Sequence, residues 1–172
     1  VVSGEKDGKP EFTTFLVEND TPGFTQEPMN RKMMWRASNT GRLTFEKVVL
    51  PKENMLGAHG QGSHIMLATL DGGRLSIAAM ALGCAQGAYE MALAYSKERE
   101  QFGKPISKFQ AVSFKLADMA MKIEAARCLL YKACRIKDAG LPYGKEAAMA
   151  KLYCSEVAAE VCDNAVQVMG GH

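Results

Sequence analysis

The spacing of hydrophobic residues along this chain differs between its first part and its second part. Up to about Pro51, β-branched and aromatic residues gather in two short runs, residues 12–17 and 43–50, each closed by turn residues or a proline. Such runs are typical of antiparallel strands. From about residue 62 the apolar residues recur in steps of three and four, which indicates helices. The pattern predicts an α+β fold in which part of an antiparallel β domain precedes long helices.

Proline and glycine residues in the second half mark the ends of three predicted long helices. The first extends to about residue 98 and is apolar on nearly all sides between residues 75 and 85, so we expect burial on most of its faces. The second begins after Pro105 and stops at Gly140, and the third covers about residues 145–169. Helices this long, joined by short loops, favour a C-terminal up-down helical bundle, with three of four long helices present.

The spacing of apolar residues also predicts which helix faces form the core. In the second helix the expected stripe is Phe109, Val112, Leu116, Met119, Ile123, Ala126, Leu130 and Ala133. In the third helix it is Leu152, Ala158, Cys162, Ala165 and Met169. The boundary between the two parts falls near residue 58, which gives expected domains of residues 1–58 and 59–172.

Composition narrows the class of protein. Of the 172 residues, 47% are hydrophobic and 23% are charged, which is typical of a soluble globular chain. The net charge of +2 gives no indication of nucleic-acid binding. The longest uncharged stretch, residues 75–89, is too short and too polar to predict membrane insertion. The chain opens on Val1 without a signal peptide and stops on Gly-Gly-His, so we expect it to be truncated at both ends.

Cysteine and histidine usage predicts no metal site. The five cysteines all fall in expected helices and form no Cys-x-x-Cys pair, which favours buried thiols in a reducing compartment. The three histidines have no partner at metal-ligand spacing. Bacterial cytoplasm and mitochondrial matrix both fit reduced thiols.

Two segments of the first helix and its following loop could bind a ligand. Arg74 follows Asp71-Gly-Gly at the edge of the most apolar stretch, where it could bind an anion or simply pair with Asp71. The loop at residues 98–105 contains Arg99, Gln101 and Phe102 beside a glycine turn, groups that suit a phosphate and a planar ring. The alternative is a solvated connection with Phe102 tucked under it.

Two further segments have a structural explanation beside the functional one. Residues 107–110 fit a Ser-x-x-Gln capping box, in which Gln110 would begin a helix without any ligand. Residues 167–171 are explained by a helix end and a glycine stop, yet Gly170 and Gly171 would also let backbone amides approach a ligand closely.

Taken in order along the chain, these segments resemble the acyl-CoA dehydrogenase family of flavoproteins. The similar stretches are Phe-Leu-Val-Glu-Asn-Asp-Thr-Pro-Gly at residues 15–23, Trp-Arg-Ala-Ser at 35–38, Leu-Thr-Phe-Glu at 43–46, Val-Leu-Pro-Lys-Glu-Asn at 49–54, Leu-Asp-Gly-Gly-Arg at 70–74, Ala-Leu-Gly at 81–83, Arg-Glu-Gln-Phe-Gly at 99–103, Phe-Gln at 109–110 and Gln-Val-Met-Gly-Gly at 167–171. The resemblance implies a subunit of a helical domain, a middle β domain and a four-helix bundle, assembled as a homo-oligomer, usually a tetramer, with FAD between subunits.

The resemblance also implies roles for matching residues. Arg99 and Gln110 would bind the pyrophosphate and adenosine side of the FAD of a neighbouring subunit, with Gln101 and Phe102 beside them. Gln167, Val168, Met169, Gly170 and Gly171 would line the same dinucleotide. Asp71, Gly72, Gly73 and Arg74 would contact the acyl-CoA thioester.

The implied reaction is α,β-dehydrogenation, in which a glutamate removes the α proton, the β hydride passes to the flavin, and electrons leave to an electron-transfer flavoprotein. In one branch of the family the glutamate directly precedes the arginine that matches Arg74, but here that residue is Gly73. The base is then expected beyond residue 172, so no catalytic residue is assigned here. We expect this polypeptide alone to be inactive and to hold FAD poorly.

Asp71-Gly-Gly-Arg is most similar to the short-chain members, which suggests a short or branched acyl chain. A flavin oxidase or monooxygenase of the same superfamily is the alternative enzyme. A non-catalytic helical assembly module is the alternative outside enzymes.

Overall fold

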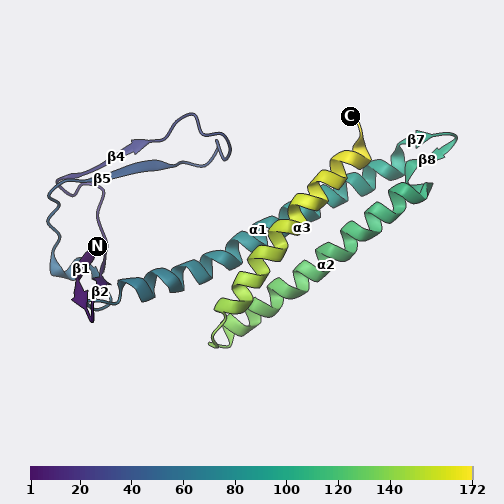
Figure 1. Cartoon of the computed structure of the whole chain (residues 1–172). Helices are drawn as coiled ribbons and strands as arrows, with labels where there is room; N and C mark the ends of the chain where they lie inside the picture. The colour runs from purple at the N-terminus through teal and green to yellow at the C-terminus, as the bar shows by residue number, and fades with distance from the viewer. Residues whose placement is uncertain (172) are drawn as a thin grey trace. The chain divides into compact units, whose positions relative to one another are not determined.

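A computed structural model describes residues 1–171 of the chain. Three long helices occupy the second half and run alternately up, down and up (Figure 1). They are α1 (Gly62–Glu98), α2 (Gln110–Asp138) and α3 (Gly144–Met169). Between α1 and α2 lie a small hairpin, β7 (Glu100–Gln101) and β8 (Lys104–Pro105), and a 3-10 turn, η2 (Ile106–Lys108). The predicted up-down bundle of three helices is confirmed.

The first half contains short antiparallel strands, as predicted. They are β1 (Val2–Lys6), β2 (Lys9–Phe12), β3 (Thr14–Phe15), β4 (Phe24–Pro28), β5 (Gly41–Phe45) and β6 (Met55–Leu56), with a 3-10 turn η1 (Lys52–Asn54). They pair as β1 with β2, β3 with β6 and β4 with β5. The chain divides into two compact units, Val1–Leu67 and Ala68–His172.

Both predicted strand runs are interrupted, for local reasons. The first breaks at buried Thr13, whose hydroxyl donates to Ser3 Oγ at 2.7 Å and accepts from Gly60 N at 3.1 Å. The backbone of Thr13 still bonds to Val1, but the next residues pair with β6 instead of β1, so the run is divided where the chain changes its pairing partner. The second run ends at Phe45, since Lys47 adopts a left-handed φ of 52° and cannot continue a strand.

The core stripe predicted for α2 is confirmed from Leu116 to Ala133, while Phe109 and Val112 at its start are only half-buried. Its buried residues are Leu116, Met119, Ile123, Ala126, Leu130 and Ala133. The stripe predicted for α3 is wrong: Leu152 is 58% exposed, and Ala165 alone of the predicted set is fully buried. The buried face consists of Ala147, Ala150, Cys154, Val157, Val161, Ala165 and Val168. These buried residues recur in steps of three and four, so the periodicity did contain the packing face, and the predicted set lay mostly on the neighbouring side of the helix.

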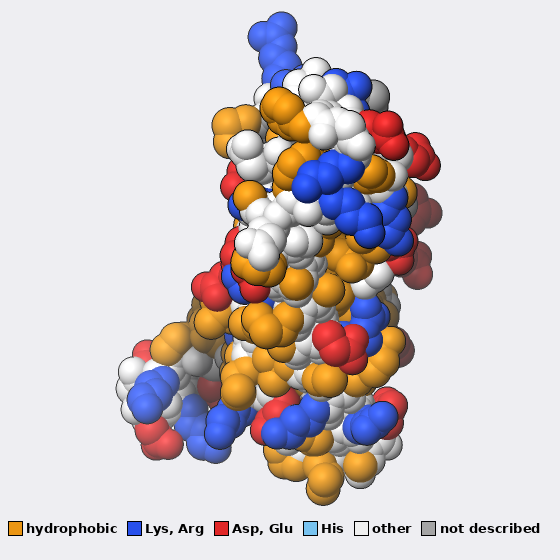
Figure 2. All heavy atoms as spheres, turned by 90° about the vertical axis from the view of Figure 1, so that its right-hand side faces the viewer, with side chains coloured by type: hydrophobic (Ala, Val, Ile, Leu, Met, Phe, Trp, Pro, Cys, Tyr) orange, Lys and Arg blue, Asp and Glu red, His pale blue; other side chains and the backbone are white. Residues whose placement is uncertain are grey.

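The prediction that α1 is buried on most of its faces is also wrong: in the structure of residues 1–171, only one side of the helix is buried. Leu75, Ala78 and Leu82 are buried, yet Ile77 and Met80 are 44% and 40% exposed. The reason is that α2 and α3 cover α1 from one side. Figure 2 shows hydrophobic side chains reaching the surface among charged ones.

By length and hydropathy alone α1 could cross a membrane, although its longest uncharged stretch suggested otherwise. An 18-residue window of the helix has a mean hydropathy of 1.4. A helix in the core of a soluble protein passes the same test, so this property does not decide between the two environments.

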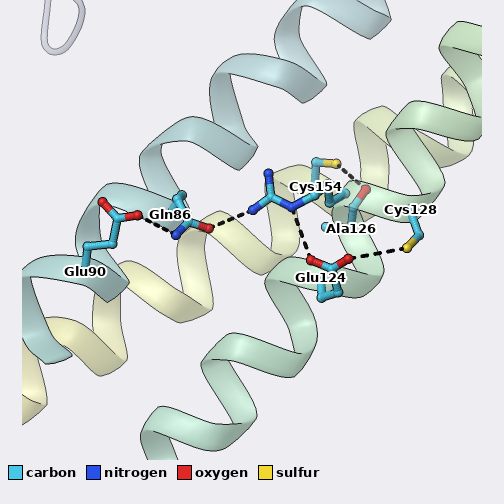
Figure 3. Close-up of polar contacts among 7 residues, drawn as sticks. Gln86, Glu90, Glu124, Ala126, Cys128 and Cys154 are labelled. Atoms are coloured by element: carbon cyan, nitrogen blue, oxygen red, sulfur yellow. Dashed lines mark hydrogen bonds and ion pairs between the residues drawn. The ribbon is translucent and has the colours of Figure 1, made fainter.

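Polar contacts join the three helices at mid-length (Figure 3). Arg127 of α2 donates from Nη2 to Gln86 Oε1 of α1 at 2.7 Å and from Nε to Glu124 Oε2 at 3.2 Å. The thiol of Cys154 on α3 donates to the carbonyl oxygen of Ala126 on α2 at 3.6 Å. Helices α2 and α3 are the most closely packed pair, and small residues on both faces explain why.

The five cysteines lie in helices as predicted, but they are not all buried. Cys154 is buried and Cys84 and Cys128 are exposed. Burial raises the pKa of the Cys154 thiol above its ordinary value of 9.0. Among residues 1–171 all five are free thiols.

Candidate functional site

The candidate site lies at the end of the bundle where α1 gives way to the β7–β8 hairpin. Arg99 immediately follows α1, and its backbone amide donates to the Tyr95 carbonyl oxygen at 2.8 Å. Its own carbonyl oxygen accepts from the Ile106 amide, also at 2.8 Å, after the chain has turned back through the hairpin. These two bonds fix Arg99 at the base of the hairpin.

The end of α3 lies at the same end of the bundle. Gly170 follows Met169 with a left-handed φ of 69°, which glycine adopts at little cost, and its amide donates to the Val166 carbonyl oxygen at 2.9 Å. A Cβ atom added at Gly170 or Gly171 would meet no other atom within 4 Å. The backbone here therefore borders open space that a ligand could approach closely.

A hollow of about 450 Å³ joins these two segments. It is lined by Tyr95, Arg99, Gln101, Ile106, Val168, Met169, Gly170 and Gly171. Six residues expected to bind the cofactor, Arg99, Gln101 and residues 168–171, thus surround one space although about 70 positions separate them in sequence. Sequence reasoning missed Tyr95 and Ile106. Tyr95 lies one helical turn before Arg99, a spacing that could have indicated it.

The other three expected cofactor residues do not line the hollow. Gln167 is exposed near the end of α3, and Gln110 is the exposed first residue of α2. Phe102 is 91% exposed at the tip of the hairpin, so the alternative in which it is tucked under the loop is wrong.

The predicted capping box is wrong as well. Phe109 is the N-cap of α2, it makes no side-chain capping bond, and Ser107 lies in η2. The helix starts late because a 3-10 turn, closed by the Phe109 amide on the Ile106 carbonyl oxygen at 3.1 Å, occupies the preceding residues. Gln110 therefore has no capping role.

The chemistry of the hollow suits an anion attached to a flat or apolar group. A guanidinium and a carboxamide supply donors on one side, and none of the lining residues is a carboxylate. Ile106, Val168 and Met169 supply apolar surface. The residues present fit the diphosphate of a dinucleotide.

The expected substrate residues lie elsewhere, within α1. Asp71 Oδ1 and Arg74 Nη1 form an ion pair one turn apart, which is the simpler of the two alternatives for Arg74. Asp71 Oδ2 also lies 2.8 Å from where a Cβ on Gly144 would be, at the start of α3, where a negative charge is favourable. Gly73 borders open space, and a Cβ on Gly72 would lie 3.9 Å from the Tyr143 hydroxyl.

These two groups of residues are far apart in one chain. With a rise of 1.5 Å per residue, the helical path from Asp71 to Glu98 is about 40 Å. One small ligand therefore cannot contact both groups of a single chain. Among residues 1–171, no cluster of three His, Cys, Asp or Glu side chains is placed to hold a metal ion.

Comparison with known proteins identifies the family. A family model described as "Acyl-CoA dehydrogenase, C-terminal domain" matches residues 60–172. This chain belongs to the acyl-CoA dehydrogenase family. Among curated relatives, the short-chain specific acyl-CoA dehydrogenase of Megasphaera elsdenii is 51% identical over 165 residues, which are 96% of this chain and 43% of that protein.

Solved structures of acyl-CoA dehydrogenase relatives share the fold. The three-dimensional structure of butyryl-CoA dehydrogenase from Megasphaera elsdenii superposes with a TM-score of 0.92 and 49% identity, covering 99% of this chain and 44% of that one. A chain in a structure described for the electron transferring flavoprotein of Acidaminococcus fermentans gives a TM-score of 0.88 and 53% identity, with 92% and 42% covered. The present chain thus spans less than half the length of these relatives.

Proposed function

We propose that this chain forms part of an FAD-dependent acyl-CoA dehydrogenase that oxidises the α,β bond of a short or branched acyl-CoA thioester. The observation that carries this proposal is the hollow where Arg99 and Gln101 meet Gly170 and Gly171. Relatives of 49–51% identity with short-chain or butyryl-CoA names support the substrate class.

In this proposal the hollow holds the diphosphate side of FAD. Arg99 stays protonated at any working pH and donates to phosphate oxygens, while Gln101 adds a neutral donor. Gly170 and Gly171 let backbone come close to the dinucleotide, and the side chains of Val168 and Met169 cover its apolar surface. Gln110, Gln167 and Phe102 extend the contact around the rim. When bound, the flavin supplies the acceptor for the hydride that leaves the β carbon.

The separation of about 40 Å along α1 supports an FAD shared between subunits. The residues at the hollow would bind the cofactor of a neighbouring protomer, while Asp71 to Arg74 would serve a different active site. Exposed apolar residues on α1, such as Ile77 and Met80, fit an assembled homo-oligomer, for which we propose a tetramer.

At the substrate end, residues 71–74 would position the acyl-CoA rather than react with it. The ion pair with Asp71 holds Arg74 and leaves the pair neutral overall. Gly73 has open space where a side chain would be, so a ligand can approach the helix closely there. Gly73 cannot remove a proton and Asp71 is paired with Arg74, so the general base of this proposal lies outside these residues. We propose an electron-transfer flavoprotein as the partner that accepts the electrons. For the compartment we propose the bacterial cytoplasm or the mitochondrial matrix.

Anaerobic titration of the complete protein with butyryl-CoA tests this function. We expect a flavin absorbance band that bleaches as the substrate is added, because the reduced cofactor loses that band. A protein without flavin, or flavin unaffected by any acyl-CoA, would support an assembly module instead. Stoichiometric oxygen uptake during turnover would identify an oxidase or monooxygenase.

A further inference from the structure

The hairpin beside the hollow ends in a strained turn. Gln101 pairs with Lys104, and the two residues between them, Phe102 and Gly103, both have left-handed φ values, 52° and 75°. This is the geometry of a two-residue turn that favours Asn or Asp at its first position. A bulky phenylalanine is disfavoured there, and such strain persists where surrounding contacts hold it in place.

Besides the backbone pairing of the hairpin, two side chains of this turn contact the ring of Phe109. The Phe102 ring, although largely exposed, lies edge to face with it, with centroids 6.1 Å apart and planes at 85°. The Lys104 ammonium lies over the same ring, 4.5 Å from its centroid. We name these three residues, Phe102, Lys104 and Phe109, the Phe109 clamp.

The backbone of Phe109 is fixed by hydrogen bonds at the start of α2. Phe109 is the N-cap of α2, and its carbonyl oxygen accepts from the amides of Val112 and Ser113 at 3.0 and 2.9 Å. Lys104 takes part in none of the ion pairs formed by residues 1–171, so the aromatic ring is the contact that orients its charge. The clamp therefore fastens the exposed tip of the hairpin to the start of α2.

The position of the clamp connects it to the candidate site. Gln101 lines the hollow and is paired with Lys104 in the hairpin, and Gln110 directly follows Phe109. Movement of the tip would change the positions of Gln101 and Phe102 relative to Gln110. We infer that Lys104 and Phe109 are positioning residues for the proposed FAD site, an inference that rests on the proposed function.

The test uses the complete protein, with FAD affinity measured by titrating apoprotein with FAD. Lys104→Met keeps the length of the side chain but removes the charge, and we expect the FAD dissociation constant to rise by up to about 5-fold, the full worth of an exposed cation–π contact. Lys104→Arg should restore the affinity because a guanidinium also stacks on a ring. Lys108→Met is the matched control, since Lys108 is an exposed lysine in η2 with no contact to the ring.

A double-mutant cycle separates the clamp from a general effect of charge. Phe109→Leu removes both ring contacts and should weaken FAD binding more than Lys104→Met does. Adding Lys104→Met to Phe109→Leu should then cause no further loss, since the two residues act through one contact. If Phe109→Leu fails to fold, the comparison of Lys104→Met, Lys104→Arg and Lys108→Met still decides.

Arg99→Ala, measured in parallel, distinguishes failure of the clamp's role from failure of the proposed FAD site. Unchanged FAD affinity in Lys104→Met, or an equal loss in Lys108→Met, would overturn the role of the clamp, while a loss in Arg99→Ala would leave the proposed function standing. Unchanged affinity in both Arg99→Ala and Lys104→Met would overturn the proposed function itself.

Discussion

Replacing Met119 by alanine tests the packing of the helical core. Met119 is 1% exposed on α2 and is the largest fully buried side chain among residues 1–171. The substitution removes Cγ, Sδ and Cε. At about 0.8 kcal/mol for each methylene-sized group, the lost transfer free energy is about 2.4 kcal/mol. A residual cavity adds to this loss, so we expect the free energy of unfolding to fall by about 3 to 4 kcal/mol.

The neighbouring methionine provides a matched control. Met121 lies two residues later on the same helix and is 62% exposed, so Met121→Ala should change the free energy of unfolding by less than about 0.5 kcal/mol. Urea unfolding of the complete protein, at one fixed protein concentration, measures both variants. Equal losses in the two variants, or a larger loss for Met121→Ala, would refute the assigned core face of α2.

Three further predictions concern the ends and surfaces of the helices. Gly170→Ala should destabilise the end of α3 by about 1 to 3 kcal/mol and weaken FAD binding, measured by thermal melting and FAD titration, because a φ of 69° with a ψ of −130° disfavours a side chain. The hydrogen bond with Glu160 raises the pKa of Lys122 above 10.5, so the pair contributes to stability below pH 10.5 and loses that contribution as the pH rises through the folded-state pKa. Accordingly, the stability difference between the natural protein and Glu160→Gln should shrink above pH 10.5. In thiol labelling of the native protein, exposed Cys128 should react before buried Cys154, whose raised pKa also reduces its thiolate fraction.

Helix positions could be predicted from the sequence because they follow from local signals. Gly140 stops α2 as a glycine C-terminal signal should, and Gly170 stops α3 with a left-handed φ. The core face of α2 was equally predictable, because its polar and apolar sides differ. In α3 the buried residues recur just as regularly, from Ala147 to Val168, but the predicted set lay mostly on the neighbouring side of the helix.

The residues of the candidate site could be predicted only one segment at a time. Spacing suggested that Arg99 and Gly170 each suit an anion, but nothing in the sequence alone showed that the ends of α1 and α3 meet at one hollow. The resemblance to a family connected them, and the up-down order of the helices explains the meeting. The start of α2 was mispredicted because the 3-10 turn before Phe109 depends on the hairpin, a contact that no short motif encodes.

The flavin content of Arg99→Ala in the complete protein tests the central claim most directly, with Arg135→Ala, an exposed arginine in the last turn of α2, as its matched control. Loss of a charge-assisted hydrogen bond to phosphate is expected to weaken FAD binding about 10- to 100-fold. We predict that Arg99→Ala purifies with little flavin and recovers it at high FAD concentration, while Arg135→Ala retains it. Full flavin occupancy in Arg99→Ala at limiting FAD would contradict the assignment of this end of the bundle to the cofactor.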